Sequence, residues 1–246
     1  MEKENEENEK DVAVTISSNT LFNFMKKYDF LIQALEKGLW PRYSVEPCWN
    51  GKHFAIPMLC FCDIPLSHIK KHIGEYGEYG IGITKDFARK HNLTPVVYVS
   101  PDSTMMSKIK YYVSSYNKPS GKREMDLNEY LLYFVKKTRG KNCGKKNQKF
   151  YDEREWRYIP DTTQDVHLEV FDDLDSAIAE KDKLSTKTSN MRIQLKPDDI
   201  TYIFVSTDTD KKKLLKKIDN IYMDNADVAD LMKTKILTCK QIREDF

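Results

Sequence analysis

The chain of 246 residues contains no apolar run that approaches the roughly 18 residues of a membrane-spanning helix. It begins with MEKENEENEKD, a charged stretch that lacks the apolar core of a signal peptide. These two absences predict a cytoplasmic protein without membrane contact. Because the same stretch is acidic and poor in apolar residues, residues 1–18 are expected to form a disordered tail. A single domain is expected over residues 19–246.

Several chemical motifs are also missing. There is no Gly-rich phosphate loop of the Walker or Rossmann type, and no serine stands in a GxSxG turn. The five cysteines are odd in number and lack zinc-site spacing, so reduced thiols and no metal site are expected. With a net charge of +2, no overall field selects nucleic acid or a membrane. These absences argue against several common nucleotide-binding folds, against serine hydrolases and against zinc proteins.

The chain does contain an irregular succession of helix and strand patterns. Helical periodicity predicts helices at 25–38, 65–77, 85–92, 125–137, 208–218 and 225–234. Short apolar runs predict strands at 58–64, 79–84, 95–100, 155–159, 166–171, 191–195 and 201–206. Since no regular alternation of strand and helix is present, the predicted class is α+β.

The stretch DEREWRYIP at 152–160 joins a charged cluster to a strand pattern. In a strand, Glu153, Glu155 and Arg157 point to one face, which places two carboxylates beside a guanidinium. One interpretation is a solvated edge with an ordinary ion pair. The other is a carboxylate in a cleft that binds or activates a hydroxyl, lined by Glu155 and Arg157 together with Tyr79, with Glu153 at its rim.

Histidines and tyrosines lie close together at residues 68–79. His68 and His72 share one face of the predicted helix, and Tyr76 follows one turn later. A metal pair, a polar pocket wall and ordinary packing all remain open, although the HExxH motif is absent. The glycine-rich run EYGEYGIGIT allows a ligand to approach closely, so the rings of Tyr76 and Tyr79 could stack on a base. Both tyrosines could equally be core residues.

A third cluster is basic. Residues 135–149 contain seven Lys and Arg residues and no acidic residue, and Gly140 and Gly144 predict a loop. Such a loop is either simply solvated or a surface for phosphate, nucleic acid or an acidic partner. The segment from Lys136 to Lys149 is therefore a candidate nucleic-acid contact.

Three longer stretches carry a family resemblance. TLFNFMKKYDFLIQALEKGLWPRYSVE, PMLCFCDIPLSHIKKHIGEYGEYGIGITKDFARKHNLTPVVYV and FYDEREWRYIP together closely resemble the AbiGi family of abortive phage resistance proteins, which is labelled as the antitoxin partner. The resemblance runs from about Leu21 to Ile221. It implies a role in abortive-infection phage defence and a partner that is a cognate toxin or another defence protein.

A more distant likeness connects the chain to ADP-ribosyltransferase toxins of the DNA-modifying type. LFNFMKKYDFLIQALEKGL resembles their first strand and helix, and Glu153-Arg154-Glu155 resembles their late Glu-x-Glu strand. This likeness implies a split, mixed β-sheet flanked by helices, with NAD as the cofactor. Glu155 and Glu153 would be catalytic, because a fixed carboxylate stabilises the positive charge that develops as nicotinamide departs.

The same likeness assigns NAD contacts to Asn23, Tyr76, Tyr79 and Arg157. Asn23 stands where these enzymes keep a histidine, and its amide can bind a ribose but cannot carry charge. Three functions therefore stay open: an antitoxin-like binding component with such a pocket, an active NAD-dependent ADP-ribosyltransferase, and a nucleic-acid-binding module.

Overall fold

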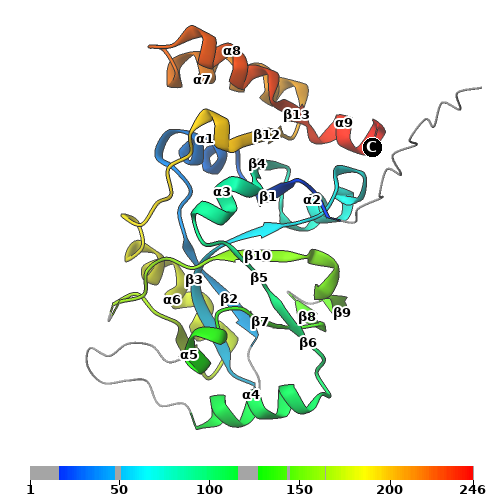
Figure 1. Ribbon diagram of the computed structural model, residues 1–246, viewed down its shortest axis with the longest axis vertical. Helices are drawn as coiled ribbons and strands as arrows, with labels where there is room; N and C mark the ends of the chain where they lie inside the picture. Colours follow the sequence, from blue (N-terminus) through cyan, green and yellow to red (C-terminus); the bar gives the residue numbers. More distant parts are fainter. Residues whose placement is uncertain (1–16, 48–50, 116–126, 143–144, 164, 246) are drawn as a thin grey trace, which may run out of the picture.

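The structure is a computed structural model, which describes residues 17–47, 51–115, 127–142, 145–163 and 165–245 (Figure 1). Within these residues the strands are β1 (Thr20–Met25), β2 (Arg42–Pro47), β3 (His53–Cys62), β4 (Tyr79–Thr84), β5 (Thr94–Pro95), β6 (Val97–Val99), β7 (Val135–Lys137), β8 (Arg139–Asn142), β9 (Lys145–Lys149), β10 (Glu155–Tyr158), β11 (Glu169–Phe171), β12 (Ile200–Val205) and β13 (Ile236–Thr238).

The helices are α1 (Tyr28–Lys37), α2 (Lys70–Tyr76), α3 (Lys85–Lys90), α4 (Thr104–Ser114), α5 (Leu127–Leu131), α6 (Leu174–Thr186), α7 (Asp208–Ile221), α8 (Ala226–Thr234) and α9 (Cys239–Asp245). Short 3-10 helices are η1 (Leu66–His68), η2 (Phe150–Glu153) and η3 (Pro197–Asp199).

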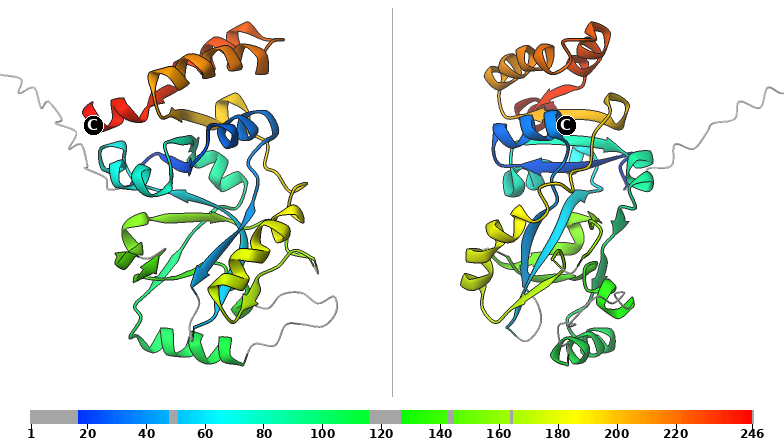
Figure 2. Two further views of the ribbon diagram at one scale, coloured as in Figure 1. Left: turned by 180° about the vertical axis from the view of Figure 1, so that it is seen from behind. Right: turned by 90° about the vertical axis from the view of Figure 1, so that its left-hand side faces the viewer.

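A mixed sheet with the strand order β13-β12-β4-β1-β3-β10-β5 forms the centre of the fold. Neighbouring strands along this path are antiparallel except β12 and β13, which are parallel. Figures 1 and 2 show α7 and α8 at one end of the molecule and α4 at the other. The predicted α+β class and the mixed sheet flanked by helices are confirmed.

Strand β3 connects two groups of strands. Residues 59–62 pair with β10, whereas residues 53–58 pair with β2 and residues 53–55 also pair with β11 on the other side. Ten residues of continuous strand are long enough for this change of partners, and most of its side chains are buried. The candidate site lies where β3 passes from one group to the other.

Local sequence explains the two helices that line that site, α1 and α2. In α1 the residues Leu31, Ala34 and Leu35 recur at helical spacing and are buried, whereas Phe30, which the same spacing assigns to the apolar side, is exposed. Gly38 ends the helix with a φ of 83°, a left-handed conformation that glycine adopts without strain. The predicted helix at 65–77 is divided, because Pro65 precedes the 3-10 helix η1 and α2 begins only at Lys70.

The predicted amphipathic helix at 125–137 is wrong over most of its length. Helix α5 ends at Leu131, and Leu132, Tyr133 and Phe134 are buried in succession and not at helical spacing. The backbone N–H of Val97 donates to the Phe134 carbonyl at 2.8 Å, and the chain continues as β7, parallel to β6. Strand pairing therefore replaces the helix that the periodicity predicts.

The basic segment is likewise not a loop. Its described residues form β7 and an antiparallel hairpin of β8 and β9, and Gly144, one of the two glycines behind the loop prediction, lies outside the described residues. A further correction concerns residues 191–195, which form no strand within the described chain, since only Ile193 makes an isolated bridge to Leu39.

The predicted acidic tail falls mostly on residues 1–16, which lie outside the described residues. Its last two positions contact Asp63, the residue that follows β3. Ser17 Oγ donates to Asp63 Oδ2 and Ser18 N to Asp63 Oδ1, both at 2.8 Å, and Lys85 Nζ also lies 3.0 Å from Asp63 Oδ2.

None of the helices in the described residues combines the length and the apolar character that a membrane crossing requires.

Replacing Gly77 by alanine is expected to destabilise the fold by more than about 1 kcal/mol. Gly77 has a φ of 131°, and an added Cβ would overlap the Met25 carbonyl at the end of β1. Gly74→Ala is the matched control, because a Cβ there meets nothing within 4 Å and alanine favours the helix α2. Urea unfolding compares the two variants, and equal midpoints would contradict the packing described.

Candidate functional site

A cavity of about 690 Å³ lies against β1, β2, β3 and α2. Its volume falls within the range of roughly 300–1,000 Å³ that is usual for small-molecule sites. The polar and charged side chains in its wall are Asn23, Lys26, Gln33, Arg42, Ser44, Glu46, His72, Glu75, Tyr76, Lys136, Lys137, Gln148, Glu153, Glu155 and Arg192. Aromatic residues of the wall include Phe22, Phe24, Phe30, Trp40, Phe54, Phe61 and Phe150.

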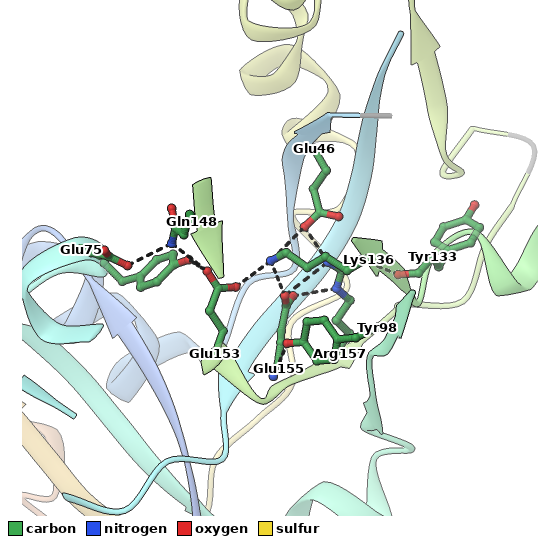
Figure 3. A network of polar contacts seen from close by, with 10 residues as sticks. Glu46, Glu75, Tyr98, Tyr133, Lys136, Gln148, Glu153, Glu155 and Arg157 are labelled. Carbon is green, nitrogen blue, oxygen red and sulfur yellow. Dashed lines mark hydrogen bonds and ion pairs between the residues drawn. The ribbon is translucent and has the colours of Figure 1, made fainter. Parts of the chain in front are cut away.

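A buried ion cluster forms one wall of this cavity. Arg157 Nε donates to Glu155 Oε1 at 2.7 Å, and Lys136 Nζ donates to Glu155 Oε2 at 2.7 Å. The Arg157 side chain is fully buried and Glu155 is 6% exposed. Arg157 also donates from Nη2 to Glu46 Oε1 at 2.5 Å and from Nη1 to the Tyr133 carbonyl at 2.7 Å. Figure 3 shows Lys136 between Glu153, Glu155 and Glu46.

The second carboxylate of DEREWRYIP joins the same cluster. Glu153 Oε2 accepts from Lys136 Nζ at 2.8 Å, and its Oε1 accepts from the Tyr76 hydroxyl at 2.7 Å. Gln148 Nε2 donates to Glu153 Oε1 and to Glu75 Oε2, each at 3.1 Å. One buried lysine therefore holds two glutamates that lie two residues apart in the sequence.

The backbone places these groups in two different ways. In β10, Glu155 and Arg157 are buried on one face while Trp156 and Tyr158 are half-buried on the other, as the predicted alternation requires. Glu153 is not part of that strand, because it ends the 3-10 helix η2, and Arg154 follows with a left-handed φ of 44°. This turn brings Glu153 back to the side of Glu155.

Charge and burial act in opposite directions on these groups. Burial alone would raise the pKa of Glu155, but Arg157 and Lys136 outweigh it and hold that pKa well below its usual value. Burial likewise opposes the charge on Lys136, yet the three glutamates around it raise its pKa well above the usual value. Glu155 and its two cationic partners, Lys136 and Arg157, are therefore charged at neutral pH.

Tyr76, which donates to Glu153, belongs to an aromatic pair with His72. His72 packs on Tyr76 with ring centroids 4.3 Å apart, and burial lowers the pKa of His72 to about 4. Burial and the adjacent Glu153 raise the pKa of Tyr76, so its hydroxyl stays protonated and donates. Of the alternatives for His68 and His72, the structure favours a pocket wall for His72, whereas His68 is exposed.

Asn23 lies in the cavity wall on β1. Its Nδ2 donates to the Cys60 carbonyl of β3 at 2.8 Å, which fixes the orientation of the amide. Asn23, Tyr76, Glu153 and Glu155 all lie in the wall of this one cavity. Their roles in cofactor binding and catalysis stay predictions.

Two predicted members of the site lie elsewhere. Tyr79 is absent from the cavity wall, since its hydroxyl donates to Asp210 Oδ2 at 3.1 Å and its ring packs against Tyr28. Arg157 lies behind Glu155 and does not reach the cavity surface. The prediction that both side chains line an open cleft is therefore wrong. The alternative of a solvated edge strand is also wrong, because β10 lies between β3 and β5 and its charged side chains are buried.

Sequence reasoning missed Lys136, Glu46 and Tyr98. The sequence predicts Lys136 in a basic loop that is either solvated or a nucleic-acid contact, yet it is the shared partner of the three glutamates. The hydroxyl oxygen of Tyr98 accepts a hydrogen bond from the backbone N–H of Glu155 at 2.9 Å. The strand that carries Glu46 was not predicted, and no local signal ties it to β10. In the described part of the chain no group of three His, Cys, Asp or Glu residues is placed to hold a metal ion.

Comparisons with known proteins agree on one family. The family profile described as "Putative abortive phage resistance protein AbiGi, antitoxin" matches residues 50–206. A protein of Lactococcus lactis subsp. cremoris named "Abortive phage resistance protein AbiGi" is 29% identical over 226 residues, which cover 79% of this chain and 90% of that relative. No solved structure matches the chain, so the likeness to the ADP-ribosyltransferase fold stays a prediction.

Replacing Lys136 by methionine is expected to destabilise the protein by roughly 3–5 kcal/mol, the usual cost of removing one member of a buried ion pair. Methionine keeps much of the volume but leaves Glu153 and Glu155 facing each other without their shared cation. Lys183→Met on α6 is the control, since the Lys183 side chain is 79% exposed. Calorimetric or urea unfolding measures both variants, and equal stabilities would contradict the role of Lys136.

The acid sensitivity of folding should depend on Glu155. Because its pKa is lower in the folded protein than the ordinary 4.5, its stabilising effect is complete above that value and is lost as the pH falls toward the folded pKa. Between about pH 5 and pH 3 the wild type should lose up to about 1.4 kcal/mol per pH unit through this group, and Glu155→Gln should lose less. Unfolding at several pH values, with the exposed Asp86→Asn as control, tests this. Parallel curves for the wild type and Glu155→Gln would refute it.

Proposed function

This chain belongs to the AbiGi family of abortive phage resistance proteins, and from that membership we propose that it acts in phage defence as an antitoxin-like component. In this role it binds a cognate partner, a toxin or another defence protein, and its cavity binds a ligand without converting it. The family description supplies the antitoxin role, and the geometry of the carboxylates supports binding over catalysis.

The observation that carries this proposal is that the carboxylates of the site are already engaged. Glu155 gives one oxygen to Arg157 and the other to Lys136, and both oxygens of Glu153 accept hydrogen bonds as well. A catalytic carboxylate that stabilises developing positive charge must direct an available oxygen at the reacting atom. Here each carboxylate faces a fixed cation, which suits a structural wall better than a reactive group.

Asn23 supports the same conclusion. Where the resembling transferases keep a histidine, this chain has an amide whose Nδ2 is bound to the Cys60 carbonyl. Such a group can orient a ligand through its remaining hydrogen-bonding capacity but cannot supply charge.

A second candidate is an NAD-dependent ADP-ribosyltransferase. It is supported by the size of the cavity, by the ionised Glu155 in its wall and by the aromatic pair of His72 and Tyr76, against which a base or nicotinamide could pack. In that case a ligand hydroxyl would have to displace Lys136 or Tyr76 from a glutamate. Nucleic-acid binding through the basic segment is less favoured, because Lys136 is engaged in the ion cluster.

Glu155→Gln separates the first two functions. If the protein is a binding component, the variant should protect against phage as the wild type does when the two proteins are compared at equal abundance, because Lys136 and Arg157 keep Glu153 and Glu46 as partners. Purified wild type should neither consume NAD nor modify a target. The measurement is phage protection in cells that carry the natural locus, with protein abundance determined in parallel and the exposed Glu180→Gln as control.

Lost protection at normal abundance, together with NAD consumption by the wild type that Glu155→Gln abolishes, would establish the transferase and reject the binding role. Removal of an essential electrostatic group costs about two to three orders of magnitude in rate, which a consumption assay resolves easily.

A further inference from the structure

The cavity has a second charged end, formed by Trp40, Arg42 and Arg192. The guanidinium carbons of Arg42 and Arg192 each lie 4.9 Å from the centroid of the Trp40 ring. Two cations held over one indole leave several N–H donors available, because a guanidinium carries five.

The ring and one of the arginines are fixed in position by other groups. Trp40 Nε1 donates to Thr188 Oγ1 at 3.1 Å, and Arg192 Nη1 donates to the Gly38 carbonyl at 3.0 Å. Gly38 needs its left-handed conformation here, and an added Cβ would overlap the Ile193 carbonyl. The two guanidiniums are therefore presented by an ordered framework at the end of α1.

The charge at this end is poorly compensated by the protein. Among the described residues no carboxylate forms an ion pair with Arg192, and burial lowers its pKa. Arg42 pairs with Asp182 at 2.9 Å, but the Asp182 side chain is 72% exposed, and exposed pairs of this kind contribute little. An anion in the cavity would therefore meet two guanidinium groups whose positive charge the protein itself neutralises only in part.

The two ends of the cavity lie along one strand. Arg42, Ser44 and Glu46 alternate on β2 and all line the cavity, so the guanidinium end and the ion cluster are roughly 13 Å apart along the backbone. A lone anion would leave most of this length empty. An extended molecule with an anionic end and a hydroxyl-bearing end matches both the length and the polarity.

We propose that Arg42 and Arg192 bind the phosphate groups of a nucleoside diphosphate whose sugar and base extend along β2 toward Glu75, Tyr76 and Gln148. The planar guanidinium fork matches phosphate oxygens in two parallel hydrogen bonds. At the other end, Glu75 and the Asn23 amide offer acceptors for sugar hydroxyls, and the stacked rings of His72 and Tyr76 offer a face to a base. This site rests on the proposed function, because it names the ligand class of the same cavity.

The test is calorimetric titration of the full chain with ADP, and with adenosine and inorganic phosphate as its two fragments. ADP should bind, adenosine should bind much more weakly, and Arg42→Gln and Arg192→Gln should each weaken ADP binding about tenfold or more, since each removes a charge-assisted pair. Arg192→Lys should restore only part of the affinity, because it keeps the charge and loses the fork. Arg89→Gln, on α3 outside the cavity wall, should bind ADP as the wild type does.

Absence of ADP binding by the wild type would overturn the site, as would unchanged affinity in both glutamine variants at wild-type melting temperature. Inorganic phosphate that binds as tightly as ADP would also overturn it, because the proposal requires the whole length of the cavity. A separate result would reject the proposed binding role, namely NAD consumption by the wild type that Glu155→Gln abolishes. The ADP titrations of the arginine variants do not depend on turnover, so the two failures can be told apart.

Discussion

Burial of the Arg157 guanidinium is the constraint on which the surrounding structure depends. A charged group with no exposed surface must have its donors satisfied within the protein, because an unpaired charge in the interior costs several kcal/mol. The partners of Arg157 come from three separate segments: Glu155 on β10, Glu46 on β2 and the Tyr133 carbonyl ahead of β7. Those segments must therefore meet at defined positions, and Lys136 joins them by neutralising the glutamates that Arg157 leaves partly unpaired.

The cavity follows from this arrangement. Strand β3 pairs with β10 at one end and with β2 at the other, so the ion cluster that links β10 to β2 lies beside the point where β3 changes partners. Side chains of β1, β2 and α2 complete the enclosure. Because contacts within the protein hold this wall in place, a ligand would not have to order it on binding, which lowers the entropic cost of association.

The two ends of this cavity differ in how far the protein satisfies its own charges. At the end with Glu153 and Glu155, each carboxylate is matched by a cation or a hydroxyl at hydrogen-bonding distance. At the end with Trp40, the guanidinium of Arg192 lies over the indole ring and, within the part of the chain that the structure describes, donates to the Gly38 carbonyl without a carboxylate partner. Because Asp182, the partner of Arg42, is largely exposed and no described carboxylate pairs with Arg192, this end of the cavity is the one suited to binding an anion. This asymmetry is the physical reason why we propose a structural role for the glutamates and a ligand-binding role for the arginines.

The sequence by itself determined those features that depend on residues close to one another along the chain. Local periodicity and backbone preference account for the helix α1 with its stop at Gly38, for the α+β class, and for the alternation of Glu155 and Arg157 against Trp156 and Tyr158.

Only the tertiary structure decided what surrounds those residues. Lys136 lies in a segment whose composition is typical of a solvated loop. Pairing of β7 with β6 nevertheless places it beside Glu46, which is far away in the sequence, and beside Glu153 and Glu155. Likewise, Tyr79 and Arg157 share the predicted motifs yet lie outside the cavity wall, while Arg42 and Arg192 meet over Trp40 from segments 150 residues apart. Burial and charge pairing are properties of contacts between distant segments, and no local pattern specifies them.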